Sequence, residues 1–251
     1  LQIVNHDQYK LAAETNRLRV IRIRAPRGAI LDRNGISLTK NIPRFQLILN
    51  PLDFINSTPS RDARLAELSS LTGIPVDELR SATTVVRLPV SPIVLQSNLT
   101  LDEVYPLLLK SQVIPGISLE SISVREYPAG PAFSHLLGYL GNIPKSDKDA
   151  YFSRGYGLND LVGVSGLEGA LEEKLRGQDG RRYVEINAAG QVQNTVAVED
   201  AKPGDPLRLS IDAELQDASA QALENGLAAA HTTRGAVIVL EPISGEILAM
   251  V

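Results

Sequence analysis

The sequence predicts an α+β protein, in which hairpins and helices occupy separate stretches of one chain. Three observations lead to this class. Residues 24–41 hold an Asn-Gly pair between two β-prone runs, residues 60–111 hold capped segments with leucine faces, and residues 234–251 hold two apolar runs around turn residues. A length of 251 residues is enough for one to two domains.

The start of the chain is compatible with a helix. Val4, Leu11, Thr15 and Leu18 could share one helical stripe, although an ordinary helix start explains these residues as well. The sequence has no run of about 20 apolar residues that would span a membrane.

A tight hairpin is expected at Asn34-Gly35, in the segment RAPRGAILDRNGISLTKN. We expect a type I′ turn, because that turn needs a positive φ at two successive residues and Asn-Gly favours both. Asp32, just before the turn, can accept backbone N–H bonds. Arg27 and Arg33 offer guanidinium groups to acidic side chains elsewhere, although turn capping with solvated charge is the plainer interpretation.

The same segment contains a serine-lysine spacing that invites a catalytic interpretation. Ser37 and Lys40 match S-x-x-K, in which a helix places a serine nucleophile one turn from a lysine. Here the pair follows a hairpin turn, where side chains alternate between faces, so the two should point to opposite sides. The sequence has neither S-x-N nor K-T-G. We therefore expect no catalysis by Ser37.

Residues 51–159 read as a small α+β subdomain. PSRDARLAELSSLTG predicts a helix with Leu65, Leu68 and Leu71 on one face and Gly73 at its end, and IPVDELRSA predicts a second short helix. Both helices are expected to be structural.

A third helix and a strand follow in this subdomain. Thr100 and Glu103 predict a capping box for a helix that Pro106 should kink or shorten. GISLESISVREYPAG then predicts a strand that ends at residues 125–128, where Pro128 and Gly130 should turn the chain. His135, further on, is a lone histidine in an apolar segment, so a structural place is favoured over a catalytic one.

The segment GVSGLEGALEEKLRGQDG predicts a helix with Leu167, Leu171 and Leu175 on one face. Its glycine-rich entry could suggest a phosphate site. However, Gly163 and Gly166 fit neither the dinucleotide-binding nor the P-loop motif, and Glu168 in the first turn would repel an anion.

The last quarter of the chain is expected to alternate between strands and one helix. RRYVEINAAGQVQNTVAVED predicts a hairpin, and PLRLSID predicts a strand that runs into a helix capped by Asp212. RGAVIVLEPISGEILAMV predicts a final hairpin without strict alternation, which is typical of a strand pair buried on both faces. We expect the layers that cover it to come from outside residues 1–251.

Composition excludes several classes of protein. The 25 Lys and Arg residues against 29 Asp and Glu give a net charge of −4, without the basic surplus of a nucleic-acid or membrane-surface binder. The absence of cysteine excludes disulfides, thiol catalysis and thiolate metal sites, and three isolated histidines offer little for a metal. No metal and no cofactor are expected.

Five segments, in order, resemble the class B penicillin-binding proteins, the peptidoglycan transpeptidases. They are APRGAILDRNG, REYPAG followed by HLLGYLG, GVSGLEGALEEKLRGQDG, LSIDAELQ and GAVIVLEPISGEILAMV. YVEINAAGQV is similar to the elongation type, penicillin-binding protein 2, although Gln191 stands where an arginine is common. The resemblance spans nearly the whole chain, while residues 50–120 share only the general character of the family and none of its motifs.

The resemblance implies an elongated, two-part pedestal without a catalytic serine. A membrane-proximal anchor is expected at 1–50 and 156–206, an inserted α+β head at 51–155, and the first elements of a truncated transpeptidase domain at 207–251. In the family, the serine lies a few tens of residues beyond the last hairpin, and one transmembrane helix precedes the position of Leu1. The parent would thus be anchored in the cell membrane, with this region extracytoplasmic.

The resemblance also implies partners and a site. The partners are a membrane-embedded glycosyltransferase of the shape-elongation-division family, shape-determining cell-wall proteins and the chain's own transpeptidase domain, with no nucleic acid.

The family's first three motifs gather at the junction of pedestal and catalytic domain, where we expect a charge cluster with Arg33 or Arg125 paired to Glu168. The structural and inter-domain residues are expected to be Arg27, Gly28, Asp32, Arg33, Gly35, Arg125, Tyr127, Pro128, Gly163, Gly166, Leu167, Glu168 and Asp212.

Three alternatives to an elongation-type pedestal stay open. One is the pedestal of a division-type class B penicillin-binding protein. Another is a free-standing extracytoplasmic binding module, and the third is a self-contained enzyme that uses Ser37 and Lys40.

Overall fold

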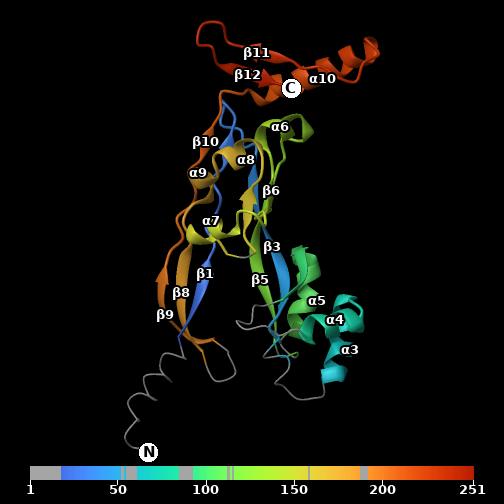
Figure 1. Ribbon diagram of the computed structural model, residues 1–251, viewed down its shortest axis with the longest axis vertical. Helices are drawn as coiled ribbons and strands as arrows, with labels where there is room; N and C mark the ends of the chain where they lie inside the picture. Colours follow the sequence, from blue (N-terminus) through green and yellow to red (C-terminus); the bar gives the residue numbers. More distant parts are fainter. Residues whose placement is uncertain are drawn as a thin grey trace, which may run out of the picture. The chain divides into compact units, whose positions relative to one another are not determined.

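The computed structural model describes residues 18–51, 54, 61–84, 93–111, 114, 116–157, 159–186 and 192–251 (Figure 1). Helices and strands are mixed along this part of the chain, which confirms the α+β class. The helix expected around Val4 and Leu11 lies outside the described residues.

The chain forms two compact units. Of the described residues, the first unit takes those within 18–19, 42–124 and 183–196, and the second takes those within 20–41, 125–182 and 197–251. These boundaries differ from the anchor, head and catalytic parts expected from the sequence, so that division stays a prediction.

The first unit contains a three-stranded sheet with the strand order β4-β3-β5. The strands are β3 (Lys40–Leu49), β4 (Ile93–Leu99) and β5 (Ile117–Glu126). β3 and β4 are antiparallel. Their register shifts between the pair Phe45–Leu99 and the pair Leu47–Gln96. Asn98, with a φ of 61°, lies at this irregularity and lets β4 carry an extra residue.

Three helices pack on the core of the first unit, and Figure 1 shows them beside β3 and β5. They are α3 (Arg61–Thr72), α4 (Val76–Thr84) and α5 (Leu101–Ser111). The predicted face of α3 is confirmed, because Leu65 and Leu68 are fully buried against core residues such as Leu47. Gly73 ends the helix with a φ of 72° and donates its N–H to the Ser69 carbonyl.

The capping box at the start of α5 is present in part. Glu103 Oε2 accepts hydrogen bonds from both the N–H and the hydroxyl of Thr100, each at 2.8 Å. Pro106 does not shorten the helix, which continues to Ser111. The helix tolerates Pro106 for two reasons. The fixed φ of proline fits a helix, and the Asp102 carbonyl, which lacks an N–H donor from Pro106, belongs to an exposed residue.

A second three-stranded sheet has the order β1-β8-β9. Its strands are β1 (Leu18–Ile23), β8 (Gly180–Ile186) and β9 (Val192–Glu199). β8 and β9 are neighbours, as expected for this part of the sequence.

The second unit contains most of the short elements. They are β2 (Ile30–Leu31), the 3-10 helix η1 (Pro131–Phe133), α6 (Ser134–Leu137), β6 (Leu140–Asn142), α7 (Lys148–Ser153), β7 (Leu161–Gly163), α8 (Gly166–Ala170), α9 (Glu172–Arg176), β10 (Leu207–Arg208), α10 (Ala213–Ala229), β11 (Ile238–Leu240) and β12 (Ile247–Met250). β10 runs parallel to β2, while β6 pairs antiparallel with β7 and β11 with β12. The larger of two cores in this unit is made by Ile30, Leu38, Phe133, Leu137, Leu175 and Ile211, and a smaller one is made by Ile143, Tyr156 and Val162.

The helix predicted after Gly163 is broken into α8 and α9. The break lies at Leu171, whose φ of −117° is not helical. The leucine face is kept, because Leu175 is fully buried while Leu167 and Leu171 are partly buried against the same core. Two acidic residues, Glu168 and Glu172, are buried with them.

The final hairpin is confirmed. We expected its covering layers to come from outside residues 1–251, but residues 210–216 of this chain cover one edge of β12. Ile238 of β11 pairs with Met250 of β12. On the other edge of β12, Leu248 O accepts the Asp212 N–H at 2.8 Å and Ile247 O accepts the Ser210 hydroxyl at 2.8 Å. On β11, Ile238 is 59% and Leu240 is 56% exposed, whereas on β12 Ala249 is fully buried and Ile247 is 38% exposed.

Candidate functional site

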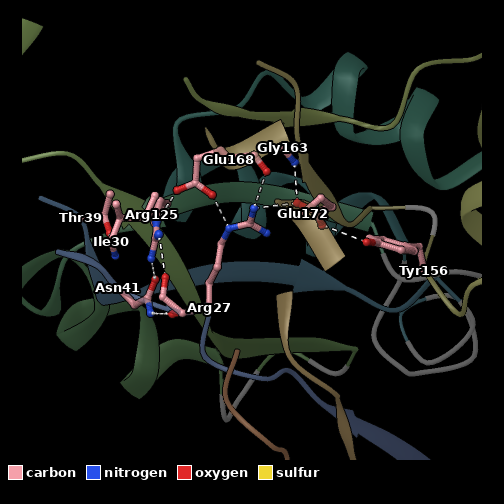
Figure 2. A network of polar contacts seen from close by, with 10 residues as sticks. Arg27, Ile30, Thr39, Asn41, Arg125, Tyr156, Gly163, Glu168 and Glu172 are labelled. Carbon is pink, nitrogen blue, oxygen red and sulfur yellow. Dashed lines mark hydrogen bonds and ion pairs between the residues drawn. The ribbon is translucent and has the colours of Figure 1, made fainter. Parts of the chain in front are cut away.

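Glu168 is the centre of a buried network of charged side chains in the second unit (Figure 2). It lies on α8, two residues after Gly166, which begins this short helix with a φ of 57°. The side chain is fully buried. Its Oε1 accepts from Arg125 Nε at 2.8 Å and its Oε2 accepts from Arg27 Nε at 2.5 Å. One carboxylate therefore binds two arginines from distant parts of the chain.

Arg125 reaches Glu168 from the end of β5, with its side chain only 3% exposed. Its NH1 group donates to Asn41 Oδ1 at 2.9 Å, and NH2 donates to the Gly28 carbonyl at 2.8 Å. Asn41 donates in turn to the Arg27 carbonyl at 2.6 Å. Every nitrogen of this guanidinium group thus donates a hydrogen bond, as a buried cation requires.

Arg27 connects the two buried glutamates. Its NH2 group lies 2.7 Å from Glu172 Oε2 and donates to the Glu168 carbonyl at 3.1 Å. Burial would lower the pKa of Arg27, but hydrogen bonds and electrostatic attraction from Glu172 and Glu168 raise it above the ordinary value. The guanidinium group is therefore held in its charged form.

Glu172 is bound on both oxygens. Oε1 accepts the Tyr156 hydroxyl at 2.9 Å, and Oε2 accepts the Gly163 N–H at 2.9 Å as well as the contact from Arg27. Burial and the negative charge of Glu172 raise the pKa of Tyr156 to about 12. The phenol therefore stays a hydrogen-bond donor across the physiological pH range.

The network combines two arginines and two glutamates, so their charges balance. Each carboxylate is occupied by hydrogen bonds and is enclosed by protein, which leaves no oxygen directed at a substrate. Such an arrangement suits the joining of chain segments rather than acid-base or nucleophilic chemistry.

Glycines let the backbone come close at this network. A Cβ atom on Gly163 would lie 1.9 Å from the Glu168 carbonyl oxygen, and one on Gly28 would lie 2.1 Å from the Asp205 carbonyl oxygen. Both distances are far below any possible contact, so these glycines are required by close approach. Gly28 also donates its N–H to the Leu175 carbonyl at 2.7 Å.

Asp32 builds the hairpin turn and differs from expectation in the turn type. Its Oδ1 accepts from the N–H groups of Asn34 at 2.8 Å and Ile36 at 2.7 Å, and its carbonyl accepts from Gly35 N–H at 3.2 Å. Among the turn residues only Gly35, with a φ of 86°, is left-handed. The type I′ prediction is therefore wrong, because the turn that the buried carboxylate of Asp32 organises starts at Asp32, one residue earlier than a turn centred on Asn34-Gly35.

Asp32 and Asp212 together hold the start of α10. Asp32 Oδ2 accepts the Ala213 N–H at 3.2 Å, and Asp212 Oδ1 caps the helix through the Leu215 N–H at 3.1 Å, which confirms the predicted N-cap. Asn34 donates from its side chain to Asp212 Oδ2 at 3.1 Å. The hairpin at residues 30–39 is thus fixed to the helix.

The structure separates the remaining predicted residues. Of the two partners considered for Glu168, Arg125 binds it and Arg33 does not: Arg33 lies 3.9 Å from Glu246 at the surface. Tyr127 is partly buried at the core, where burial and the charge of Glu168 raise its pKa to about 12. Pro128 is exposed, and Leu167 packs on the core.

Three members of the network were not singled out from the sequence: Asn41, Tyr156 and Glu172. Glu172 carried a usable signal, since it follows Glu168 by four residues and shares its helical face. Asn41 and Tyr156 gave none, because their partners come from remote segments.

Neither a metal cluster nor a membrane helix occurs in the described part of the chain. Its His, Asp and Glu residues form no group that could hold a metal ion. Among the helices with described placement, none has the length and hydropathy of a membrane span.

Known proteins match this chain at three levels. A family model described as the penicillin-binding protein dimerisation domain matches residues 22–209. The peptidoglycan D,D-transpeptidase MrdA of Acinetobacter baumannii is 30% identical over the whole chain, which spans 36% of that protein. In Escherichia coli, MrdA is 31% and the transpeptidase FtsI is 28% identical, each over the whole chain and 39% of the relative.

A solved structure shares the fold. The complex between penicillin-binding protein PBP2 and MreC from Helicobacter pylori matches 93% of this chain and 42% of the matched chain, with a TM-score of 0.70 and 23% identity. The chain spans about two fifths or less of the curated relatives it matches. Because the family model covers residues 22–209 and includes all of the buried Arg–Glu network, this chain belongs to the penicillin-binding protein dimerisation domain family.

Proposed function

We propose that this chain is the non-catalytic pedestal of a membrane-anchored peptidoglycan D,D-transpeptidase that acts during cell elongation. The observation that carries the proposal is the buried network around Glu168, which binds Arg27 and Arg125 from two other segments. The charged groups of the network form hydrogen bonds and ion pairs with one another, as expected for a scaffold. The match of MrdA proteins over the whole chain supports the same conclusion.

The catalytic step belongs to a domain that continues beyond the final hairpin. Ser37, the serine of the S-x-x-K match, donates its hydroxyl to the Thr39 carbonyl at 2.7 Å and thus has a structural partner. We propose that residues 207–251 begin the transpeptidase domain, that 1–50 and 156–206 form the anchor, and that 51–155 form the head.

The proposed partners follow from the family. The matched structure is a complex of PBP2 with MreC, which supports a shape-determining protein as a partner of this chain. The resemblance of the sequence motifs adds a membrane-embedded glycosyltransferase of the shape-elongation-division family. The parent protein would present this region outside the cell membrane.

A division role is the second candidate, because FtsI of Escherichia coli also matches the whole chain at 28% identity. Depletion of the parent separates the two roles. Loss of rod shape with continued division is expected for an elongation enzyme, whereas filaments of normal width would assign the chain to division.

A fluorescent penicillin tests the central proposal. The full-length parent protein should be labelled covalently, and its reading frame should continue after Val251 into S-x-x-K, S-x-N and K-T-G. The chain of residues 1–251 should remain unlabelled in an intact mass spectrum. A stoichiometric adduct on the chain alone would instead favour an enzyme that uses Ser37, and a natural stop codon after Val251 would favour a free-standing module.

A further inference from the structure

Gln216, the last residue of the segment LSIDAELQ, is a buried amide on α10 that was not among the expected site residues. Its side chain is fully buried. It lies one residue after Leu215, whose N–H is held by the N-cap Asp212, so the start of the helix fixes its position. A buried amide must find its hydrogen-bond partners inside the protein.

The amide of Gln216 makes three hydrogen bonds. Nε2 donates to the Met250 carbonyl at 2.6 Å and to the Ala132 carbonyl at 2.9 Å, while Oε1 accepts the Met250 N–H at 2.7 Å. Both amide hydrogens are thus used, and the oxygen faces a donor. Rotating the amide by half a turn would set its oxygen against two carbonyl oxygens, so the partners fix its orientation.

The side chain takes the place of a neighbouring strand on the edge of β12. Val251 exchanges hydrogen bonds with Val237, so the alternation of an antiparallel ladder turns the N–H and C=O of Met250 away from β11. Along that outer edge, Ser210 and Asp212 bind the carbonyls of Ile247 and Leu248. The chain then turns into α10, which lies beside β12 in Figure 1. The Gln216 amide continues the pairing at Met250.

The third hydrogen bond ties Met250 to the segment of residues 131–137. Ala132 belongs to η1, and its neighbour Phe133 is only 1% exposed in the core of the second unit. His135 of the same segment lies 2.9 Å from the Met250 carbonyl oxygen, a contact that selects the tautomer protonated at Nε2. Two side chains thus link this segment to the backbone of a single residue in β12.

We propose that Gln216 is a positioning residue of the parent transpeptidase, because it sets the place of β12 against residues 131–137 through Met250. The inference rests on the proposed function, in which this hairpin opens the catalytic domain. A displaced β12 would then shift the strands that follow it, and with them the serine that is acylated.

The test uses the full-length parent protein and its acylation by a fluorescent penicillin. Glu in place of Gln at 216 keeps the size, removes both donors and sets an oxygen against the carbonyls of Ala132 and Met250. We expect Gln216→Glu to lower the second-order acylation rate at pH 7.5 at least tenfold, measured below the melting temperature of the variant. Partial recovery is expected at lower pH, where the neutral acid regains one donor.

Two further variants complete the design. Gln221→Glu makes the same change at an exposed position of the same helix, and its acylation rate should equal that of the parent. His135→Ala removes the second contact with Met250 from an exposed side chain, so it should fold normally and lower the rate two- to threefold. It keeps the inference testable should Gln216→Glu fail to fold.

Each outcome has one meaning. If the parent protein itself is not acylated, the proposed function fails. If the parent is acylated and folded Gln216→Glu reacts at its rate, Gln216 is not a positioning residue. If Gln216→Glu does not fold, a His135→Ala rate equal to that of the parent overturns the inference. A lower melting temperature of Gln216→Glu with an unchanged rate for each folded molecule would also overturn the inference, since the role would then be only structural.

Discussion

Glu168 and Arg125 form an ion pair in which both partners are almost completely buried. Their Oε1 and Nε atoms are 2.8 Å apart, and the side chains are 0% and 3% exposed. Replacing a buried ion pair by apolar residues often costs little, but removal of one partner strands a charge away from water. Because Glu168 also binds Arg27, its carboxylate holds together three segments of the chain.

Glu168→Ala should destabilise the chain strongly. Arg27 keeps Glu172 in this variant, but Arg125 loses the one carboxylate that it binds among the described residues and stays enclosed. We expect the free energy of unfolding to fall by about 3–5 kcal/mol, as for other buried pairs that lose one partner. Urea unfolding followed by circular dichroism measures this change.

Glu173→Ala is the matched control for Glu168→Ala. Glu173 is 79% exposed and lies 3.3 Å from Arg154 at the surface. A loss of only about 0–1 kcal/mol is expected for such a pair. If both variants lost the same unfolding free energy, Glu168 would have only a simple capping role. The proposal that the chain is a scaffold would then lose its main support.

Local signals predicted those elements whose ends are set by nearby residues. Gly73 ends α3, Asp212 caps α10, and Glu103 binds Thr100, each within four residues of its partner. The type I′ prediction was wrong because a nearby residue outside the pair also acts on this turn. A carboxylate from just outside the Asn34-Gly35 pair, that of Asp32, captured the backbone of the turn.

Remote partners explain what the sequence could not reveal about the site. Arg27 and Arg33 are equally good partners for Glu168 by residue type, and only the fold places Arg27 beside it. Asn41 joins the site through Arg125, 84 residues away, and Gln216 finds Ala132, also 84 residues away. A single sequence carries no periodic pattern for such contacts.

Gly163→Ala should be destabilising, in contrast to Gly226→Ala. A Cβ atom on Gly163 would meet the Glu168 carbonyl carbon at 2.2 Å as well as its oxygen, so β7 and α8 would have to separate. Gly226 lies inside α10 with no atom within 4 Å of its Cβ position. We expect a loss of several degrees in melting temperature for Gly163→Ala and a gain of about 0.5–1 kcal/mol for Gly226→Ala.

Thermal unfolding of both glycine variants in one buffer gives the comparison. The sign of the difference is the critical result. A Gly163→Ala protein as stable as the parent would mean that β7 and α8 do not approach closely.

The capping box at α5 should give the chain a pH-dependent stability in mild acid. The Thr100 backbone N–H, and then its hydroxyl, bind charged Glu103 and lower its pKa below the ordinary value of 4.5. A lowered folded-state pKa contributes stability above the unfolded-state pKa, and this contribution is lost as the pH falls through the folded value. The stability difference between parent and Glu103→Gln should therefore be larger at pH 7 than at pH 3.

Thr100→Val checks the origin of this pH dependence, because it removes the hydroxyl and keeps the backbone N–H. Its unfolding free energy should depend on pH less steeply below 4.5 than that of the parent. Parallel pH curves for all three proteins would show that the capping box does not contribute.

Hydrogen exchange should divide the final hairpin between its two edges. The Met250 N–H is bound to the buried amide of Gln216, whereas the ladder turns the Ile238 N–H away from β12 on a strand whose side chain is 59% exposed. We expect the Met250 amide to exchange at least tenfold more slowly than that of Ile238, and Gln216→Ala to remove most of that protection. An Ile238 amide as slow as Met250 in a monomer would mean that residues outside the described pairing cover β11.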